Sequence, residues 1–126
     1  MLTEHFSESE FACRCCGQLP AAGISMALLL GLERLRARIN QPIYISSGYR
    51  CPSHNRAVGG VWNSQHVRGT AADIYVDNMS VRELARICKQ IFDSVGTYES
   101  QGFVHVDMRE GGSVPGLLSL GGLTCG

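Results

Sequence analysis

The sequence has no excess of either charge and no long apolar run. Its 126 residues carry eleven basic and eleven acidic side chains, so the formal net charge is zero, and no stripe of lysine and arginine is present. We therefore expect neither nucleic acid nor a membrane surface as a partner. The longest apolar run, residues 26–32, contains Gly31 and is too short to cross a bilayer. The first ten residues are acidic and polar, unlike a secretory signal.

The length of the chain predicts one small domain, which we expect to be monomeric. The length suits a single core but not two. The predicted domain covers residues 1–109 and begins with a lead-in, residues 1–24, that contains a cysteine cluster. A glycine-rich tail, residues 110–126, carries little pattern.

Local signals predict an α+β fold, a small antiparallel sheet with helices packed on it. Capping boxes start a short helix after Ser7 and a longer one from Ser80 to about residue 93. Ser25 caps a helix that runs to Ile39, with a buried stripe of leucines. A short helix is expected at 52–58, and strands are expected at 43–46, 70–76, 95–98 and 102–108.

Two of these strands carry a polar residue where a buried side chain is expected. On a period of two, Asp73 lies opposite the face of Ala72 and Ile74, and His105 lies opposite that of Val104. If the strands are neighbours, both side chains point from one surface, and His66 reaches in from the preceding loop. Two imidazoles and one carboxylate form the ligand set of catalytic zinc. The plainer alternative is that each is an isolated, hydrogen-bonded residue.

The motifs around these residues resemble the M15 family of zinc peptidases, in particular its D-alanyl-D-alanine carboxypeptidase subfamily, which shares its metal core with the hedgehog domain. The matching segments are SSGYR at 46–50, HNRAVGG at 54–60, NSQHVRGTAAD at 63–73 and FVHVD at 103–107. The resemblance implies that His66, Asp73 and His105 hold one zinc ion. It also implies that Arg50 and the motif residue Ser64 bind substrate, with Arg50 on a carboxylate or carbonyl oxygen of the peptide of bacterial peptidoglycan.

The sequence departs from the family pattern at the general base. Many M15 enzymes carry Glu or Asp three residues before the last histidine ligand, where this chain has Gly102. Glu99, within a YES triplet that resembles the hedgehog arrangement, is therefore the candidate base; the alternative is a solvent-facing turn residue. Asp107 shares the face of His105 and suits the orientation of a ligand better than attack on substrate.

Two classes of function remain open from the sequence. One is a zinc metallopeptidase that cleaves peptidoglycan stem peptides, either as a D-Ala-D-Ala carboxypeptidase or as an endolysin-type endopeptidase. The other is a non-catalytic zinc module that binds wall or protein partners. Because the substrate of the first lies outside the cytoplasm, a phage or prophage protein released to the cell wall is expected.

The roles of the six cysteines and of the loop at residues 62–63 are each open to more than one interpretation. The CRCCG run at 13–17 lacks a matching second pair, so buried thiols are favoured over a second metal site. A disulfide from Cys13, Cys15 or Cys16 to Cys51 is the first pairing to test. Trp62 and Asn63 either contact substrate or pack within their loop.

Overall fold

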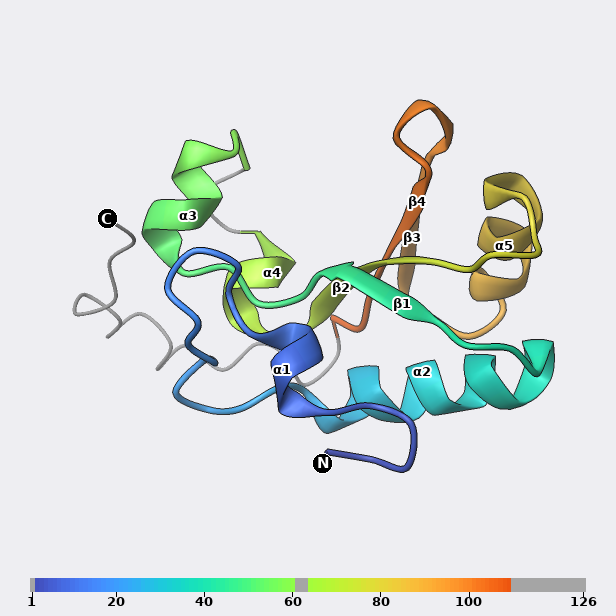
Figure 1. Cartoon of the computed structure of the whole chain (residues 1–126), viewed down its shortest axis with the longest axis horizontal. Helices are drawn as coiled ribbons and strands as arrows, with labels where there is room; N and C mark the ends of the chain where they lie inside the picture. The colour runs from blue at the N-terminus through green and yellow to red at the C-terminus, as the bar shows by residue number, and fades with distance from the viewer. Residues whose placement is uncertain (1, 61–63, 110–126) are drawn as a thin grey trace.

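The fold is α+β, as predicted, and is built on one open antiparallel sheet (Figure 1). The computed structural model describes residues 2–60 and 64–109. The strands are β1 (Tyr44–Ser47), β2 (Ala71–Tyr75), β3 (Ser94–Tyr98) and β4 (Phe103–Asp107), in the order β1-β2-β4-β3. The helices are α1 (Glu8–Phe11), α2 (Met26–Ile39), α3 (Pro52–Ala57), α4 (Gln65–Arg68) and α5 (Val81–Cys88), with a 3-10 turn η1 (Glu99–Gln101).

The helix starts predicted from serine caps are confirmed. Ser7 and Glu10 form a capping box at α1, Leu28 N donates to Ser25 Oγ at α2, and Glu83 N donates to Ser80 Oγ at α5. Each cap satisfies a backbone donor that the first helical turn leaves unpaired. The α2 leucines at 28, 29, 32 and 35 are buried in one core with the apolar face of the sheet.

The sheet register brings the two polar strand residues together. Asp73 on β2 lies opposite His105 on β4, while Ala72 pairs with Val106 and Ile74 with Val104. Because successive side chains alternate between the two faces, the apolar pairs enter the core and the polar pair lies on the other face. The two strands are therefore neighbours, which is the condition under which Asp73 and His105 were expected to point from one surface.

Three local predictions differ from the structure. The predicted loop before β2 contains the helix α4, which is too short for a periodic signal, and β1 lies one residue later than predicted. Helix α5 ends at Cys88 rather than near residue 93. There the amides of Ile91 and Phe92 both donate to Cys88 O, and the chain turns so that Phe92 packs against Gly31 of α2.

Within residues 2–60 and 64–109, none of the helices combines the length and the apolar character that crossing a bilayer requires.

Candidate functional site

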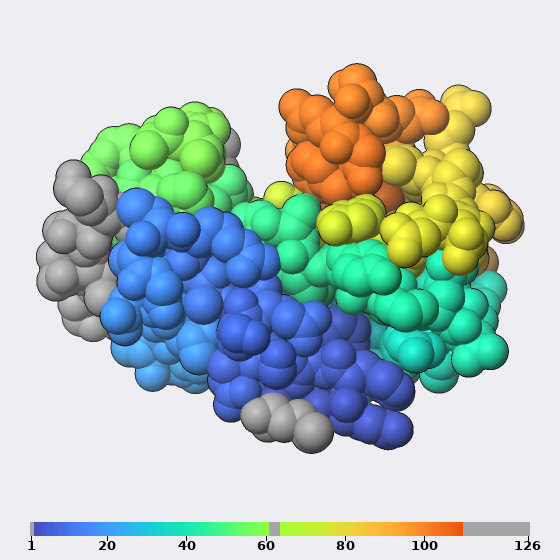
Figure 2. Space-filling view, in the orientation of Figure 1, coloured from blue at the N-terminus to red at the C-terminus, as the bar shows by residue number. Residues whose placement is uncertain are grey.

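A cleft of about 510 Å³ opens on the polar side of the sheet (Figure 2). In the space-filling view it corresponds to the hollow between the green lobe of α3 and the orange end of the β3–β4 hairpin. One wall comes from Arg50, residues 58–60 and the start of α4, and the other from the hairpin. The floor contains His66, Asp73 and His105. The volume of the cleft is within the range of small-molecule and peptide sites, roughly 300–1,000 Å³.

Three side chains converge on the floor of the cleft. Asp73 Oδ1 lies 3.2 Å from His66 Nε2 and 3.0 Å from His105 Nδ1. One donor atom from each of the three residues lies within 4.8 Å of the other two. The three residues predicted as metal ligands are thus brought together from α4, β2 and β4.

His66 is oriented by contacts at both ends of its short helix. The amide of His66 donates to Ser64 Oγ at 3.1 Å, which caps α4, and Gly69 ends the helix with a φ of 76°. The imidazole is buried, and its Nδ1 lies 2.7 Å from Gly48 O. Because a carbonyl only accepts, Nδ1 of His66 carries a proton, so Nε2 of a neutral His66 can offer its lone pair to a metal ion beside Asp73.

His105 is oriented by a carboxylate in place of a carbonyl. Its Nε2 lies 2.7 Å from Oδ2 of Asp107, a fully buried residue. The other oxygen of Asp107 accepts from Arg109 Nε at 3.0 Å. With Nε2 as the donor, Nδ1 of a neutral His105 presents a lone pair to Asp73.

The electrostatics of this group favour a cation between the three ligands. Burial alone opposes charge, but hydrogen bonds from His105 and then His66 outweigh it and lower the pKa of Asp73 to about 2. Burial likewise opposes the imidazolium, but Asp107 and Asp73 raise the pKa of His105 to about 9. Without a metal, the raised pKa of His105 favours a proton on Nδ1, between His105 and Asp73. A metal ion at the same place replaces that proton.

Zinc fits the donor set and the spacing. Ligand atoms about 2.0–2.1 Å from one zinc ion lie roughly 3.3 Å apart at a tetrahedral angle, close to the two Asp73 contacts. Both histidines have their other nitrogen committed to an acceptor, the usual way in which proteins orient imidazole ligands. Three protein ligands leave a fourth position open, as in catalytic zinc sites.

Replacing Asp107 by asparagine is expected to weaken zinc binding by about 10–100-fold, because His105 loses its anionic partner. The carboxamide introduced by Asp107→Asn also has one acceptor oxygen in place of two, so it cannot serve both His105 and Arg109 in the same geometry. The measurement is competition for zinc with a chromophoric chelator, and Asp77→Asn, at an exposed acid outside the site, is the control. Equal affinities for Asp107→Asn and the parent protein would contradict this role.

Arg50 lies on the wall of the cleft with unused hydrogen-bonding capacity. Its terminal nitrogen lies 3.4 Å from Ser64 Oγ, and its backbone amide donates to His66 O. The buried Nε of Arg50 has no hydrogen-bond partner within the part of the chain that the structure describes. A half-buried guanidinium with a spare donor beside the zinc ligands is suited to an oxygen anion of a substrate.

Glu99 is not brought to the floor of the cleft. It belongs to η1, its side chain is 59% exposed, and Oε2 lies 3.5 Å from Nε of Arg82 on α5. Its neighbours Tyr98 and Gln101 line the cleft. Among the residues that the structure describes, Glu99 is not part of this lining. Asp73 and Asp107 are the acidic residues of that lining.

Two contributors to the site escaped the sequence analysis. The carbonyl of Gly48 holds His66, and Arg109 holds Asp107. A backbone carbonyl leaves no signal in side-chain identity, although the position of Gly48 within SSGYR marks the loop. Trp62, Asn63 and the tail 110–126 lie outside the described residues.

The comparison with protein families agrees with this geometry. The model of the family described as peptidase M15 matches residues 4–107, which includes all three converging ligands and Arg50. Among curated proteins, none matches the sequence significantly. With a family match over most of its length and the ligand set assembled in a cleft, the chain belongs to the peptidase M15 family.

Proposed function

We propose that the protein is a zinc metallopeptidase that cleaves peptide bonds in the stem peptides of bacterial peptidoglycan. Membership of the M15 family indicates a metallopeptidase. The observation that carries the proposal is the convergence of His66, Asp73 and His105 at the floor of an open cleft. A zinc ion held there would supply an activated water at neutral pH and would polarise the scissile carbonyl.

The second element of the proposal is substrate binding by Arg50. The guanidinium lies on one wall, beside Ser64 and close in sequence to the carbonyl that holds His66. A stem peptide that ends in D-alanine presents a carboxylate, which an arginine can bind through two donors. Cleavage next to that carboxylate makes the enzyme a carboxypeptidase, whereas cleavage of an internal bond makes it an endolysin-type endopeptidase.

Replacing Arg50 by glutamine is expected to lower kcat/KM roughly 10–100-fold for peptides with a free terminal carboxylate, since a charge-assisted pair contributes about 1.5–3 kcal/mol. For peptides amidated at the C-terminus, the decrease in kcat/KM should be much smaller. The measurement compares the two peptides with Arg50→Gln and with Arg56→Gln, an exposed residue of α3. An equal loss on both peptides would show that Arg50 does not read the carboxylate.

Glu99 is the proposed proton acceptor, as the YES triplet suggests. Its ion pair with Arg82 is exposed, with both side chains more than half accessible. Such pairs contribute at most about 1 kcal/mol, so little holds the carboxylate away from the adjoining cleft. Catalytic contacts that are long without substrate often shorten when it binds.

The Glu99→Gln variant is expected to lose hydrolysis by about 10²–10⁴-fold and to keep its zinc, because glutamine cannot take a proton. Metal content and turnover are measured on the same sample. Glu83→Gln, at the exposed start of α5, is the matched control. Unchanged turnover in Glu99→Gln removes this residue from the mechanism.

A non-catalytic zinc module is the second candidate, and one observation favours it. The acidic residues of the described cleft lining, Asp73 and Asp107, are both engaged with histidines. A module that binds wall peptides without cutting them needs no further carboxylate.

Incubation with purified peptidoglycan separates the two candidates. We expect the zinc-loaded protein to release D-alanine or shortened crosslinked peptides, identified by mass, and a chelator to stop the release. Binding to peptidoglycan without any released fragment would favour the non-catalytic module.

A further inference from the structure

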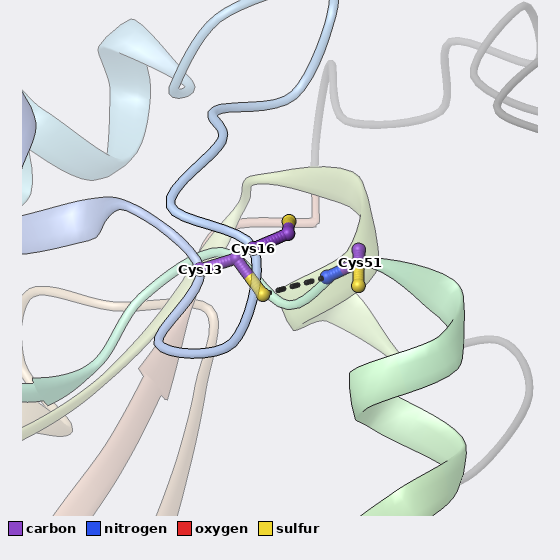
Figure 3. A group of neighbouring side chains, drawn as sticks. All are labelled: Cys13, Cys16 and Cys51. Carbon is purple, nitrogen blue, oxygen red and sulfur yellow. Dashed lines mark hydrogen bonds between the residues drawn. The ribbon is translucent and has the colours of Figure 1, made fainter. Parts of the chain in front are cut away.

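Three cysteine side chains meet behind the wall of the cleft that carries Arg50. The sulfur atoms of Cys13, Cys16 and Cys51 all lie within 4.8 Å of one another. Figure 3 shows Cys13 and Cys16 on the N-terminal loop and Cys51 at the start of α3. Cys13 and Cys51 are buried and Cys16 is half-buried, whereas Cys15, in the same loop, is exposed.

The loop is shaped to present two of these sulfurs together. Gly17 N donates to Cys13 O at 2.8 Å, and Cys13 N donates to Gln18 O at 2.9 Å, so the chain reverses over the intervening residues. Gly17 completes the reversal with a φ of 72°, a conformation that glycine adopts without strain. The pair is thus Cys13-x-x-Cys16, a spacing common to zinc ligands and contained within the CRCCG run.

Backbone donors surround the sulfurs. Cys51 N lies 3.5 Å from Cys13 Sγ, and His54 N lies 3.4 Å from Cys51 Sγ. N–H groups that point at sulfur stabilise thiolates, which are the metal-binding form of cysteine. Sulfurs on one zinc ion, each about 2.3 Å from it, lie roughly 3.8 Å apart. A group of three sulfurs within 4.8 Å of one another needs little movement to reach that spacing.

We propose that Cys13, Cys16 and Cys51 form a second metal site that binds one zinc ion through three thiolates. Water or a donor from outside the cluster takes the fourth position. A disulfide joins only two sulfurs, whereas one ion binds all three. Zinc is favoured because thiolates select soft or borderline cations.

The position of this ion indicates its role. Cys51 directly follows Arg50, and Tyr49 N donates to Phe11 O, so the N-terminal segment already contacts the chain that carries Arg50. A zinc ion shared by Cys13, Cys16 and Cys51 crosslinks these two segments. Its removal is expected to loosen the wall of the cleft without touching the peptidase zinc.

Zinc content of the full chain, purified under reducing conditions and equilibrated with zinc, tests the proposal. We expect two zinc ions per chain in the parent protein. Cys16→Ser and Cys51→Ser should each hold one, and Cys15→Ser, the matched control in the same loop, should hold two. His66→Ala should also hold one, so that loss of the peptidase zinc is distinguished from loss of the thiolate zinc.

Two further measurements keep the test decisive if Cys51→Ser does not fold. Cobalt loading should give sulfur-to-cobalt charge-transfer absorption in the parent and His66→Ala proteins, but not in Cys16→Ser. A chelator should increase the number of thiols that react with an alkylating agent. One zinc per chain, unchanged by Cys16→Ser, or a disulfide among the three cysteines in zinc-equilibrated reduced protein, would overturn the proposal.

Discussion

Replacing Asp73 by alanine is expected to abolish hydrolysis and to remove the peptidase zinc. The carboxylate lies within 3.2 Å of both histidine nitrogens and supplies the only negative charge among the three ligands. Zinc contributes several kcal/mol to transition-state stabilisation, which corresponds to a rate loss on the order of 10³-fold or more. Zinc content and peptidoglycan hydrolysis are measured in parallel.

Two variants make this result interpretable. Asp77→Ala changes an exposed acid just beyond the same strand and should leave zinc and activity unchanged. Asp73→Asn keeps the shape of the side chain but removes its charge, and should lose most of the zinc affinity. A fully active Asp73→Ala protein would show that the converging ligands are not the catalytic centre.

Replacing Gly48 by alanine is expected to lower the stability of the fold and the zinc affinity together. A Cβ there would lie 2.7 Å from Phe11 Cα and 2.9 Å from Phe11 O. These are backbone atoms of a buried residue, so no side-chain rotation relieves the overlap. Such overpacking costs about 1–3 kcal/mol or more, a decrease in Tm of roughly 5–15 °C.

The overlap with Phe11 should also shift the backbone at position 48 and thereby affect the metal site. Gly48 O accepts from His66 Nδ1, so a shift of this carbonyl misaligns one ligand and should weaken zinc binding by about 10–100-fold. Gly23→Ala is the control, because a Cβ there meets nothing within 4 Å, and its φ of 81° alone should cost about 1 kcal/mol. If Gly48→Ala and Gly23→Ala show the same Tm and the same zinc affinity, the contact with Phe11 is not the reason for glycine at position 48.

Short-range patterns in the sequence were sufficient for most of the fold. The serines before α1, α2 and α5 mark helix starts because a cap depends on residues within one turn. The alternation along β2 and β4 placed Asp73 and His105 on polar faces, since side chains in any strand alternate. Resemblance to the M15 motifs then predicted His66, Asp73 and His105 as metal ligands, and the fold brings these three residues together.

Other features depended on contacts between distant segments. The short helix that carries His66 has too few residues for periodicity, and its imidazole is oriented by the carbonyl of Gly48, eighteen positions earlier. Helix α5 stops early because Phe92 turns in to meet Gly31. Glu99 lies beside Arg82, a pairing that its local sequence does not predict.

The residue types and their spacing along the chain therefore determined the fold class and the family, and they predicted which residues converge as candidate metal ligands. Tertiary contacts alone decided the tautomers of His66 and His105, the outward position of Glu99 and the choice of Cys13 and Cys16 as partners of Cys51. The physical reason is the distance along the chain over which each kind of interaction acts. Caps and strand alternation act within a few residues, whereas orientation and convergence depend on segments that only the folded chain brings together.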